Sequence, residues 1–277
     1  MSTDSNLLAS SSEPTTSVPR AQLCWIGFTT FVARSTRDIM RFFIMTIAPP
    51  AIMTALYCAI FGGLIGQRVG TISGIAYLQF IVPGLILMPV ITESYSQAAY
   101  SLLTARYHRL IHEHLIAPQP SSMIVVSYVA GGVIRGILVG VFAGAAAVLI
   151  AHVAIKRATP MAGAMLLTSL LAALGGFISG LFAKSFEQLN WIPLLALTPL
   201  TYTSGVFYSL SSLPAWAQHL SLTNPLFYLV NLFRYSMLGV SDVGIGIGAS
   251  VSFLALAVIG MFAIAVALVR RGVGIKD

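Results

Sequence analysis

Residues 248–269 read GASVSFLALAVIGMFAIAVALV, a stretch without one charged side chain. An α-helix rises about 1.5 Å per residue, so this stretch is long enough to cross the hydrocarbon core of a bilayer. Charged residues make up only 8% of the 277-residue chain and hydrophobic residues 57%, whereas an average soluble domain carries about 25% charged residues. Too few polar side chains are present to cover a water-facing surface, so the sequence predicts a membrane protein.

Six apolar runs are long enough to cross a bilayer as helices. They are residues 44–65, 75–103, 123–152, 161–183, 191–210 and 248–269. The second and third runs exceed the length that a bilayer requires, so we expect them to tilt or to project beyond the lipid. The predicted fold is all-α, a polytopic membrane protein with six transmembrane helices.

The chain before the first run divides into two parts. Residues 1–21 are rich in Ser, Thr and Pro and lack the apolar core of a signal peptide, which predicts a disordered tail. Residues 22–43 place aromatic and aliphatic side chains at near-helical spacing among Arg34, Arg37 and Arg41. This pattern predicts an amphipathic interface helix in the headgroup layer, and a soluble linker helix is the alternative.

Prolines mark two further features of the transmembrane domain, which we assign to residues 44–277. Pro49 and Pro50 remove two amide donors, so a bend or a helix start is expected there. Residues 211–247 are apolar but contain helical pieces too short to span the bilayer. A pair of re-entrant helices between the fifth and sixth runs fits this segment, since irregular backbone at membrane depth requires cover by protein or water.

Lysine and arginine lie at the ends of the apolar runs rather than together on one soluble face, which argues against nucleic-acid binding. Short cytoplasmic loops are enriched in these residues. One side of the predicted topology carries Arg20, Arg34, Arg37, Arg41, Arg106, Arg109, Lys184, Arg270, Arg271 and Lys276. The other side carries Arg68, Lys156, Arg157 and Arg234, and Arg135 falls inside the third run. We therefore expect both termini to be cytoplasmic in a multi-pass protein of a bacterial inner membrane.

A phosphate-binding loop of the form G-x-x-x-x-G-K-[ST] is absent from the sequence. The lysines are Lys156, Lys184 and Lys276, and none of them follows a glycine. Such a loop holds nucleotide phosphates through its backbone amides and its lysine. We therefore expect a chain that is not itself an enzyme and holds no cofactor, so that any ATP hydrolysis comes from a separate chain.

The segment after the second run, residues 104–122, reads TARYHRLIHEHLIAPQPSS. Its helix-favouring first half would present charged side chains to the cytosol, as a docking surface for a soluble motor does, and a merely solvated loop is the alternative. The docking candidates are Arg106, Arg109, His112, Glu113 and Pro118.

A metal site is a third interpretation of this segment, because His108 and His112 are spaced i, i+4 with Glu113 and His114 beside them. Only His152 and His219 occur elsewhere, and both are assigned to the opposite side. We therefore expect no metal.

Polar residues within the apolar runs are candidates for a translocation pathway, because an ionised group in hydrocarbon costs several kcal/mol and usually faces a partner or a cavity. Glu93 in the second run either lines a pathway or pairs with Arg135. The fifth run is unusually polar and aromatic, which favours a pore wall or, alternatively, a kinked packing helix. The pathway candidates are Glu93, Thr198, Thr201, Tyr202, Ser204 and Tyr208.

Small residues follow a four-residue repeat in two runs. They are Gly132, Gly136, Gly140 and Gly144 in the third run, with Gly176 and Gly180 in the fourth. Such stripes allow helices to approach closely, so we interpret them as packing surfaces.

Residues 222–239, LTNPLFYLVNLFRYSMLG, carry Asn224, Pro225, Tyr228 and Arg234. This arrangement resembles the signature of the ABC-2 type permeases, the membrane subunits of bacterial ABC exporters. Further similarity lies in Pro49-Pro50, in LQFIVPGLI at residues 78–86, and in Arg109, Glu113, Leu115 and Pro118. The resemblance covers the chain from about residue 25 to its end, and its compact form resembles the small permeases of drug-resistance and nodulation-factor export.

The resemblance implies a six-helix protomer that pairs with a second copy of itself as a homodimer in membrane lipid. Each protomer would dock on a separate ATP-binding cassette subunit, which binds ATP and Mg²⁺. The implied function is export of an amphipathic or lipid-linked substrate, such as a drug, a glycolipid, a lipo-oligosaccharide or a polysaccharide, out of the cytoplasm or the inner leaflet. A charged Glu93 inside a span departs from the pattern, so an ion-coupled secondary transporter using Glu93 is the alternative, and a membrane-embedded enzyme or channel-like scaffold built on the histidine cluster is another.

Overall fold

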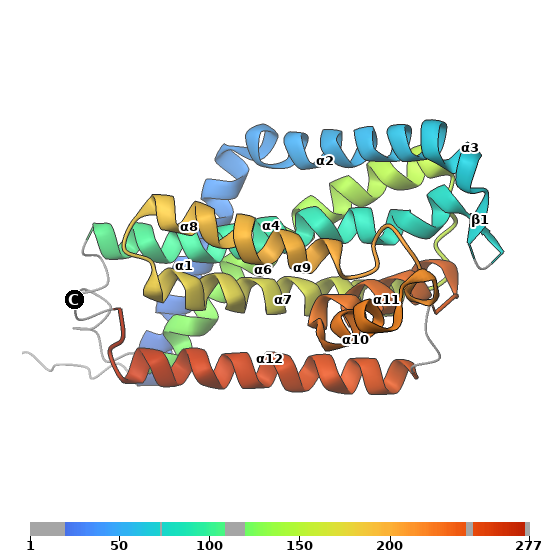
Figure 1. Ribbon diagram of the computed structural model, residues 1–277. Coiled ribbons are helices and arrows are strands. Elements are labelled where there is room, and N and C mark those ends of the chain that lie inside the picture. The colour runs from blue at the N-terminus through green and yellow to red at the C-terminus, as the bar shows by residue number, and fades with distance from the viewer. Residues whose placement is uncertain (1–19, 73, 109–119, 242–245, 275–277) are drawn as a thin grey trace, which may run out of the picture.

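The computed structural model describes residues 20–72, 74–108, 120–241 and 246–274. Helices make up most of this part of the chain (Figure 1). Its strands, β1 (Thr71–Ile72) and β2 (Ile75–Ala76), are two residues each and pair antiparallel just before a long helix. The predicted all-α class is confirmed.

Five helices of the described part are long and apolar enough to cross a membrane. They are α2 (Phe43–Ile60) with the π-helical turn η1 (Phe61–Ile65), α4 (Tyr77–Tyr107), α6 (Ser121–Ala151), α7 (Ala158–Phe182) and α12 (Ile247–Arg270). Figure 1 shows α4, α7 and α12 running alongside one another, with α6 crossing them at a tilt. At 31 residues each, α4 and α6 are roughly 47 Å long, which exceeds a hydrocarbon core of about 30 Å. These helices match five of the six predicted spans, including the excess length of the second and third.

The predicted span at residues 191–210 is replaced by an earlier and shorter helical segment. It consists of α8 (Phe186–Ile192), the π-helical turn η2 (Pro193–Leu197) and α9 (Thr198–Tyr202), joined end to end. The segment runs along the bundle in Figure 1, but its length of roughly 25 Å is below that of a complete crossing. The predicted boundaries were too late in the chain, and six complete spans are not confirmed.

The first helix, α1 (Arg20–Arg41), runs across one end of the bundle, close to the start of α2 (Figure 1). Its partly buried and buried side chains include Phe31, Ser35 and Ile39, while Arg37 and Arg41 are exposed. The predicted amphipathic helix at residues 22–43 therefore exists as a helix. Its location in the headgroup layer stays a prediction.

The helix start expected at Pro49-Pro50 was wrong, because α2 begins at Phe43, and the bend expected there stays a prediction. Both prolines lie inside α2, and the chain turns instead at Phe42, between α1 and α2. Each proline removes one backbone hydrogen bond, and both lost bonds fall near the beginning of the helix. The hydrogen bonds of the other turns of α2 are sufficient to maintain the helix despite these two losses.

At the opposite end of the bundle, two short helices follow a 3₁₀ turn, η3 (Leu210–Ser212). They are α10 (Ala215–Thr223) and α11 (Pro225–Leu238). The four-residue α3 (Gly66–Val69) lies at the same end (Figure 1). The two helical pieces predicted between residues 211 and 247 are present, and their re-entry into a membrane stays a prediction.

Helix α4 forms the centre of the bundle, with many fully buried side chains, because α6 and α7 approach it through their glycines. A Cβ atom on Gly132 would lie 2.7 Å from the carbonyl oxygen of Ser94, and one on Gly176 would lie 2.1 Å from that of Tyr95. Both distances are too short for a real contact. The predicted packing role of these two glycines is therefore confirmed.

Candidate translocation site

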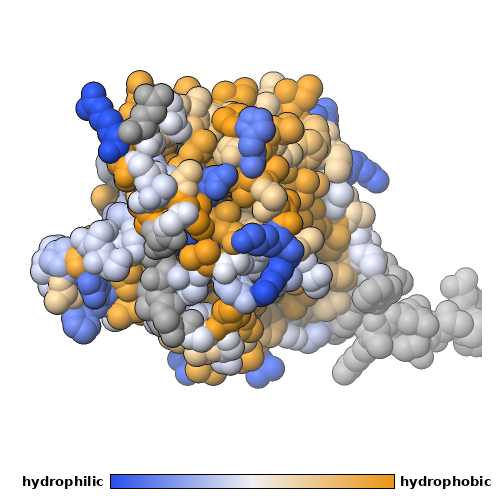
Figure 2. All heavy atoms as spheres, turned by 90° about the vertical axis from the view of Figure 1, so that its right-hand side faces the viewer, coloured by the Kyte–Doolittle hydropathy of each residue, from blue (hydrophilic) through white to orange (hydrophobic). Residues whose placement is uncertain are grey.

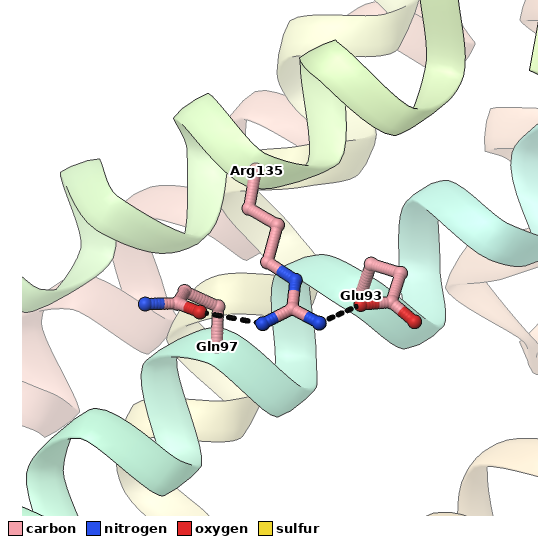
Figure 3. A network of polar contacts seen from close by, with 3 residues as sticks. All are labelled: Glu93, Gln97 and Arg135. Atoms are coloured by element: carbon pink, nitrogen blue, oxygen red, sulfur yellow. Dashed lines mark hydrogen bonds and ion pairs between the residues drawn. The ribbon is translucent and has the colours of Figure 1, made fainter. Parts of the chain in front are cut away.

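An ion pair joins α4 and α6 inside the bundle. Arg135 Nη2 lies 2.6 Å from Glu93 Oε2, and Arg135 Nη1 donates a hydrogen bond of 2.8 Å to Gln97 Oε1 (Figure 3). Glu93 and Gln97 are one helical turn apart on α4, so both can face the same guanidinium. Of the two interpretations of Glu93, the structure shows pairing with Arg135.

The glycines of α6 bring Arg135 to its partners. Gly136 follows Arg135 directly, and a Cβ atom there would lie 1.8 Å from Ser94 Oγ. The side chains of Arg135 and Glu93 retain 26% and 20% of their surface exposed. An isolated charge at membrane depth costs several kcal/mol, and the pairing of Glu93 on α4 with Arg135 on α6 reduces this cost.

The hydroxyl groups expected to line a pathway mostly bond within their own segment. Thr198 donates to the Pro193 carbonyl at 3.2 Å and Thr201 to the Leu197 carbonyl at 2.6 Å. These are local bonds, in which a side chain returns to the preceding turn. These two hydroxyls are therefore already bonded.

Of the remaining pathway candidates, Tyr202 is the last residue of α9, and Ser204 and Tyr208 follow it. Ser204 is fully buried and donates to the Thr201 carbonyl, whereas Tyr208 donates to the Tyr202 carbonyl at 3.1 Å. Tyr202 is 47% exposed, and Thr198 is exposed as well. Among the described residues, no hydrogen bond or ion pair joins Glu93 to this group, so the structure does not bring the candidates together as one site.

Arg234 is completely buried in α11. Its Nη2 donates to the Gly205 carbonyl at 2.7 Å, its Nε donates to the Phe80 carbonyl at 3.2 Å, and the guanidinium carbon lies 3.9 Å from the centre of the Phe80 ring. Carbonyl dipoles and an aromatic face both stabilise a cation that has left water. Arg234 therefore anchors α11 to α4 and to the turn after α9, and it is not the loop charge that its sequence position suggested.

Asn224 caps the start of α11. Its Oδ1 accepts a hydrogen bond from the Leu226 amide at 2.9 Å, and its Nδ2 donates to the Leu200 carbonyl at 2.6 Å. Pro225 occupies the first helical position, where its missing amide is no loss. Tyr228 donates to the Leu222 carbonyl at 2.9 Å. In this structure the predicted signature residues hold α10, α11 and α9 together.

Arg106, near the end of α4, is directed to the end of α7. One nitrogen, Nη1, donates to the carbonyls of Gly180, Leu181 and Ala183 at 2.8 to 3.0 Å. Carbonyls at a helix C-terminus lack partners within the helix and carry partial negative charge. Arg106 thus joins the ends of α4 and α7.

The family model of the ABC-2 type transporter matches residues 27–238 of this sequence. The chain belongs to the ABC-2 type transporter family. It is 40% identical over 255 residues to the inner membrane transport permease YadH of Escherichia coli (strain K12), covering 92% of this chain and 99% of that protein. It is also 27% identical over 216 residues to nodulation protein J of Rhizobium meliloti (strain 1021), covering 76% of this chain and 80% of that protein.

Membership in the ABC-2 family shows that the chain is a membrane transport subunit of an ABC transporter. A subunit of this kind transports rather than catalyses, and it associates with an ATP-binding subunit. The similarity to an inner membrane permease, together with several apolar helices, places this ABC-2 permease in the inner membrane as a multi-pass protein.

Most of the predicted docking residues of the permease lie outside the described residues. They are Arg109, His112, Glu113 and Pro118. Arg106 is described, and its contact with α7 leaves its docking role a prediction. On α1, Arg34, Arg37 and Arg41 are all exposed, as an interface helix requires.

Sequence reasoning missed Gln97 as a partner of the ion pair and Gly205 as an acceptor for Arg234. Gln97 lies four residues after Glu93, and that spacing was a usable signal. Gly205 has a positive φ of 72°, a conformation that suits glycine. No local pattern predicts that its carbonyl meets a side chain 29 residues later.

Proposed function

We propose that this ABC-2 permease exports an amphipathic or lipid-linked substrate from the cytoplasm or the inner leaflet. The substrate class includes drugs, glycolipids, lipo-oligosaccharides and polysaccharides. Two copies of the permease form the pathway as a homodimer, and each docks on an ATP-binding subunit that holds ATP and Mg²⁺. Of the five spans, α2 and α12 are the least buried within one copy, so a second copy or lipid must cover them.

The observation that carries the orientation is the unequal charge of the two bundle ends. One end contains α1, the end of α4 and the end of α12 (Figure 1). Its described cations are Arg34, Arg37, Arg41, Arg106, Lys184, Arg270 and Arg271. Because cytoplasmic loops are enriched in Lys and Arg, we assign this end to the cytoplasm, with both termini there.

The opposite end carries fewer cations. Figure 2 shows it with hydrophilic side chains scattered among apolar ones. Its described loop cations are Arg68, Lys156 and Arg157. Arg157 is held against Tyr235, with its guanidinium carbon 4.8 Å from the ring centre. This end faces away from the cytoplasm in the proposed topology.

The proposed mechanism begins at the cytoplasmic end. Closure of two ATP-binding subunits pushes on residues 106–117 and on α1, and the α8–α9 segments of the two copies then separate. The contact of Arg106 with the end of α7 supports this route, because α7 leads directly into α8. A force on the end of α4 would therefore reach α8 through packed helices.

The test uses the complex of the permease with its ATP-binding subunit. Arg109→Ala and Glu113→Ala should each weaken co-purification of the two proteins and lower ATP hydrolysis in proteoliposomes. Arg68→Ala serves as the matched control, because Arg68 is exposed at the opposite end and should leave both measurements unchanged. Full association and hydrolysis in both docking variants would overturn the docking assignment.

The ion-coupled alternative is distinguished by a second preparation, which omits the ATP-binding subunit. A secondary transporter using Glu93 would transport in vesicles that contain the permease alone, driven by an ion gradient without nucleotide. The ABC-2 exporter should be inactive under those conditions. The pairing of Glu93 with Arg135 and Gln97 supports a structural use of this carboxylate instead.

A further inference from the structure

A cavity of about 410 Å³ with both polar and apolar lining lies beneath α1, at the end of the bundle assigned to the cytoplasm. Its lining includes Arg34 and Asp38 of α1, Gln97 and Tyr100 of α4, and Tyr128 of α6. The volume falls in the range of small-ligand sites, about 300 to 1,000 Å³. The cavity is therefore large enough for the head group of an amphiphile.

The cavity extends from the bundle end towards the ion pair. Thr104 lies within one turn of the end of α4, and Gln97 is two turns deeper, roughly 10 Å further along the helix. Gln97 accepts the hydrogen bond from Arg135 described above. The inner part of the cavity is thus lined by Gln97, the residue that bonds to Arg135.

Two opposite charges face this cavity without neutralising each other. Arg34 and Asp38 are one turn apart on α1, and both are exposed. With the cation before the anion, this order is the weaker one for a pair within a helix. Within the described ranges, neither side chain forms an ion pair. Both charges therefore remain available to a ligand.

The amide of Gln97 has a defined orientation. The guanidinium of Arg135 can only donate, so the oxygen of Gln97 must face it. The amide nitrogen then points away from Arg135, as Figure 3 shows. Gln97 accordingly offers two N–H donors to a ligand in the cavity.

We propose that this cavity binds the phosphoethanolamine head group of a membrane lipid. The phosphate accepts hydrogen bonds from Arg34 and from the Gln97 amide, and the ammonium group donates to the carboxylate of Asp38. Tyr100 and Tyr128 supply aromatic surface, which attracts an ammonium ion. The inference rests on the proposed placement of α1 in the headgroup layer.

The arrangement distinguishes among common head groups. A phosphoglycerol head group has no cation for Asp38, and it places its negative charge near that carboxylate. A choline head group carries a cation without N–H donors, so it cannot donate a hydrogen bond to Asp38. Phosphoethanolamine combines a phosphate for Arg34 with N–H donors for Asp38, a combination that the other two head groups lack.

The experiment measures lipid retention by the full-length permease without ATP or its ATP-binding subunit. The protein is reconstituted into vesicles of equal parts phosphatidylethanolamine, phosphatidylglycerol and phosphatidylcholine, then extracted, and bound lipid is counted by native mass spectrometry. We expect phosphatidylethanolamine to be retained about tenfold over the other two, because charge-assisted hydrogen bonds discriminate to this extent. Arg34→Gln and Asp38→Asn should each remove the preference.

Arg37→Gln is the matched control, because Arg37 lies on the same helix, is exposed and does not line the cavity. It should retain phosphatidylethanolamine like the unaltered protein. All three changes are at exposed positions, where effects on folding are small. Equal retention of the three lipids, or an unchanged preference in Asp38→Asn, would overturn the assignment. Because neither ATP nor the ATP-binding subunit is present, lipid retention does not depend on export. A separate assay with both proteins and ATP that detects no export would refute the proposed function and leave this inference standing.

Discussion

Replacing Gly176 by Ala should separate α4 from α7. A Cβ atom at this position would lie 2.1 Å from the carbonyl oxygen of Tyr95, and 2.8 and 2.9 Å from two further backbone atoms of that residue. Backbone cannot rotate away as a side chain can, so one helix must move by about 1 Å. Overpacking of this kind costs about 1 to 3 kcal/mol.

The neighbouring Gly175 is a matched control on the same helix. Its added Cβ would meet nothing closer than the Met261 side chain, at 3.7 Å. Both substitutions gain about 0.5 to 1 kcal/mol from the better helix propensity of Ala, so this gain cancels in the comparison. Gly176→Ala should therefore be less stable than Gly175→Ala by about 2 kcal/mol, roughly thirtyfold in the folded-to-unfolded ratio.

The assay is unfolding of the purified full-length permease in mixed micelles by increasing SDS, followed by tryptophan fluorescence. The difference between the two variants is the measured quantity. If Gly176→Ala proves as stable as Gly175→Ala, then α7 does not approach α4 as closely as the structure indicates. The glycine-based account of the bundle centre would then be wrong.

Three further predictions concern the polar contacts. Glu93→Gln should lower the free energy of unfolding by about 1 to 3 kcal/mol, less than for a fully buried pair because both side chains keep some exposure. The double variant with Arg135→Gln should recover most of this loss in the same SDS assay. An absence of recovery would contradict the pairing. Asn224→Ala should destabilise the start of α11 by about 1 kcal/mol and speed hydrogen exchange at the Leu226 amide, whereas unchanged exchange would refute the capping role. Arg106→Gln should weaken the charge-assisted bonds to the end of α7 and increase hydrogen exchange at residues 180–184. Unchanged exchange there would show that α7 ends independently of α4.

The long helices could be predicted because hydropathy depends only on local composition. The uncharged stretch at residues 248–269 can satisfy its backbone in lipid only as a helix, and α12 occupies nearly the same residues. The short helices α10 and α11 were also predictable, because Pro214 and Pro225 stand immediately before or at their first residues. Proline at a helix start is favoured by its fixed φ and its missing amide.

The remaining features depend on contacts between distant parts of the chain. The segment from α8 to α9 is apolar like the other spans, and nothing in its composition reveals that it ends at Tyr202 rather than Leu210. The burial of Arg234 requires the carbonyl groups of Phe80 and Gly205, which the fold brings together. The Glu93–Arg135 pair could be anticipated because both charges fall within spans, but the participation of Gln97 follows from how α4 and α6 pack.

The most direct test of the exporter assignment is purification of the tagged permease from membranes that also contain its co-expressed ATP-binding subunit. The account predicts a complex with equal numbers of the two proteins, two of each, that hydrolyses Mg²⁺-ATP. The permease purified alone should neither bind nor hydrolyse ATP. A permease that hydrolyses ATP by itself, or that forms no complex with an ATP-binding subunit, would contradict the central claim.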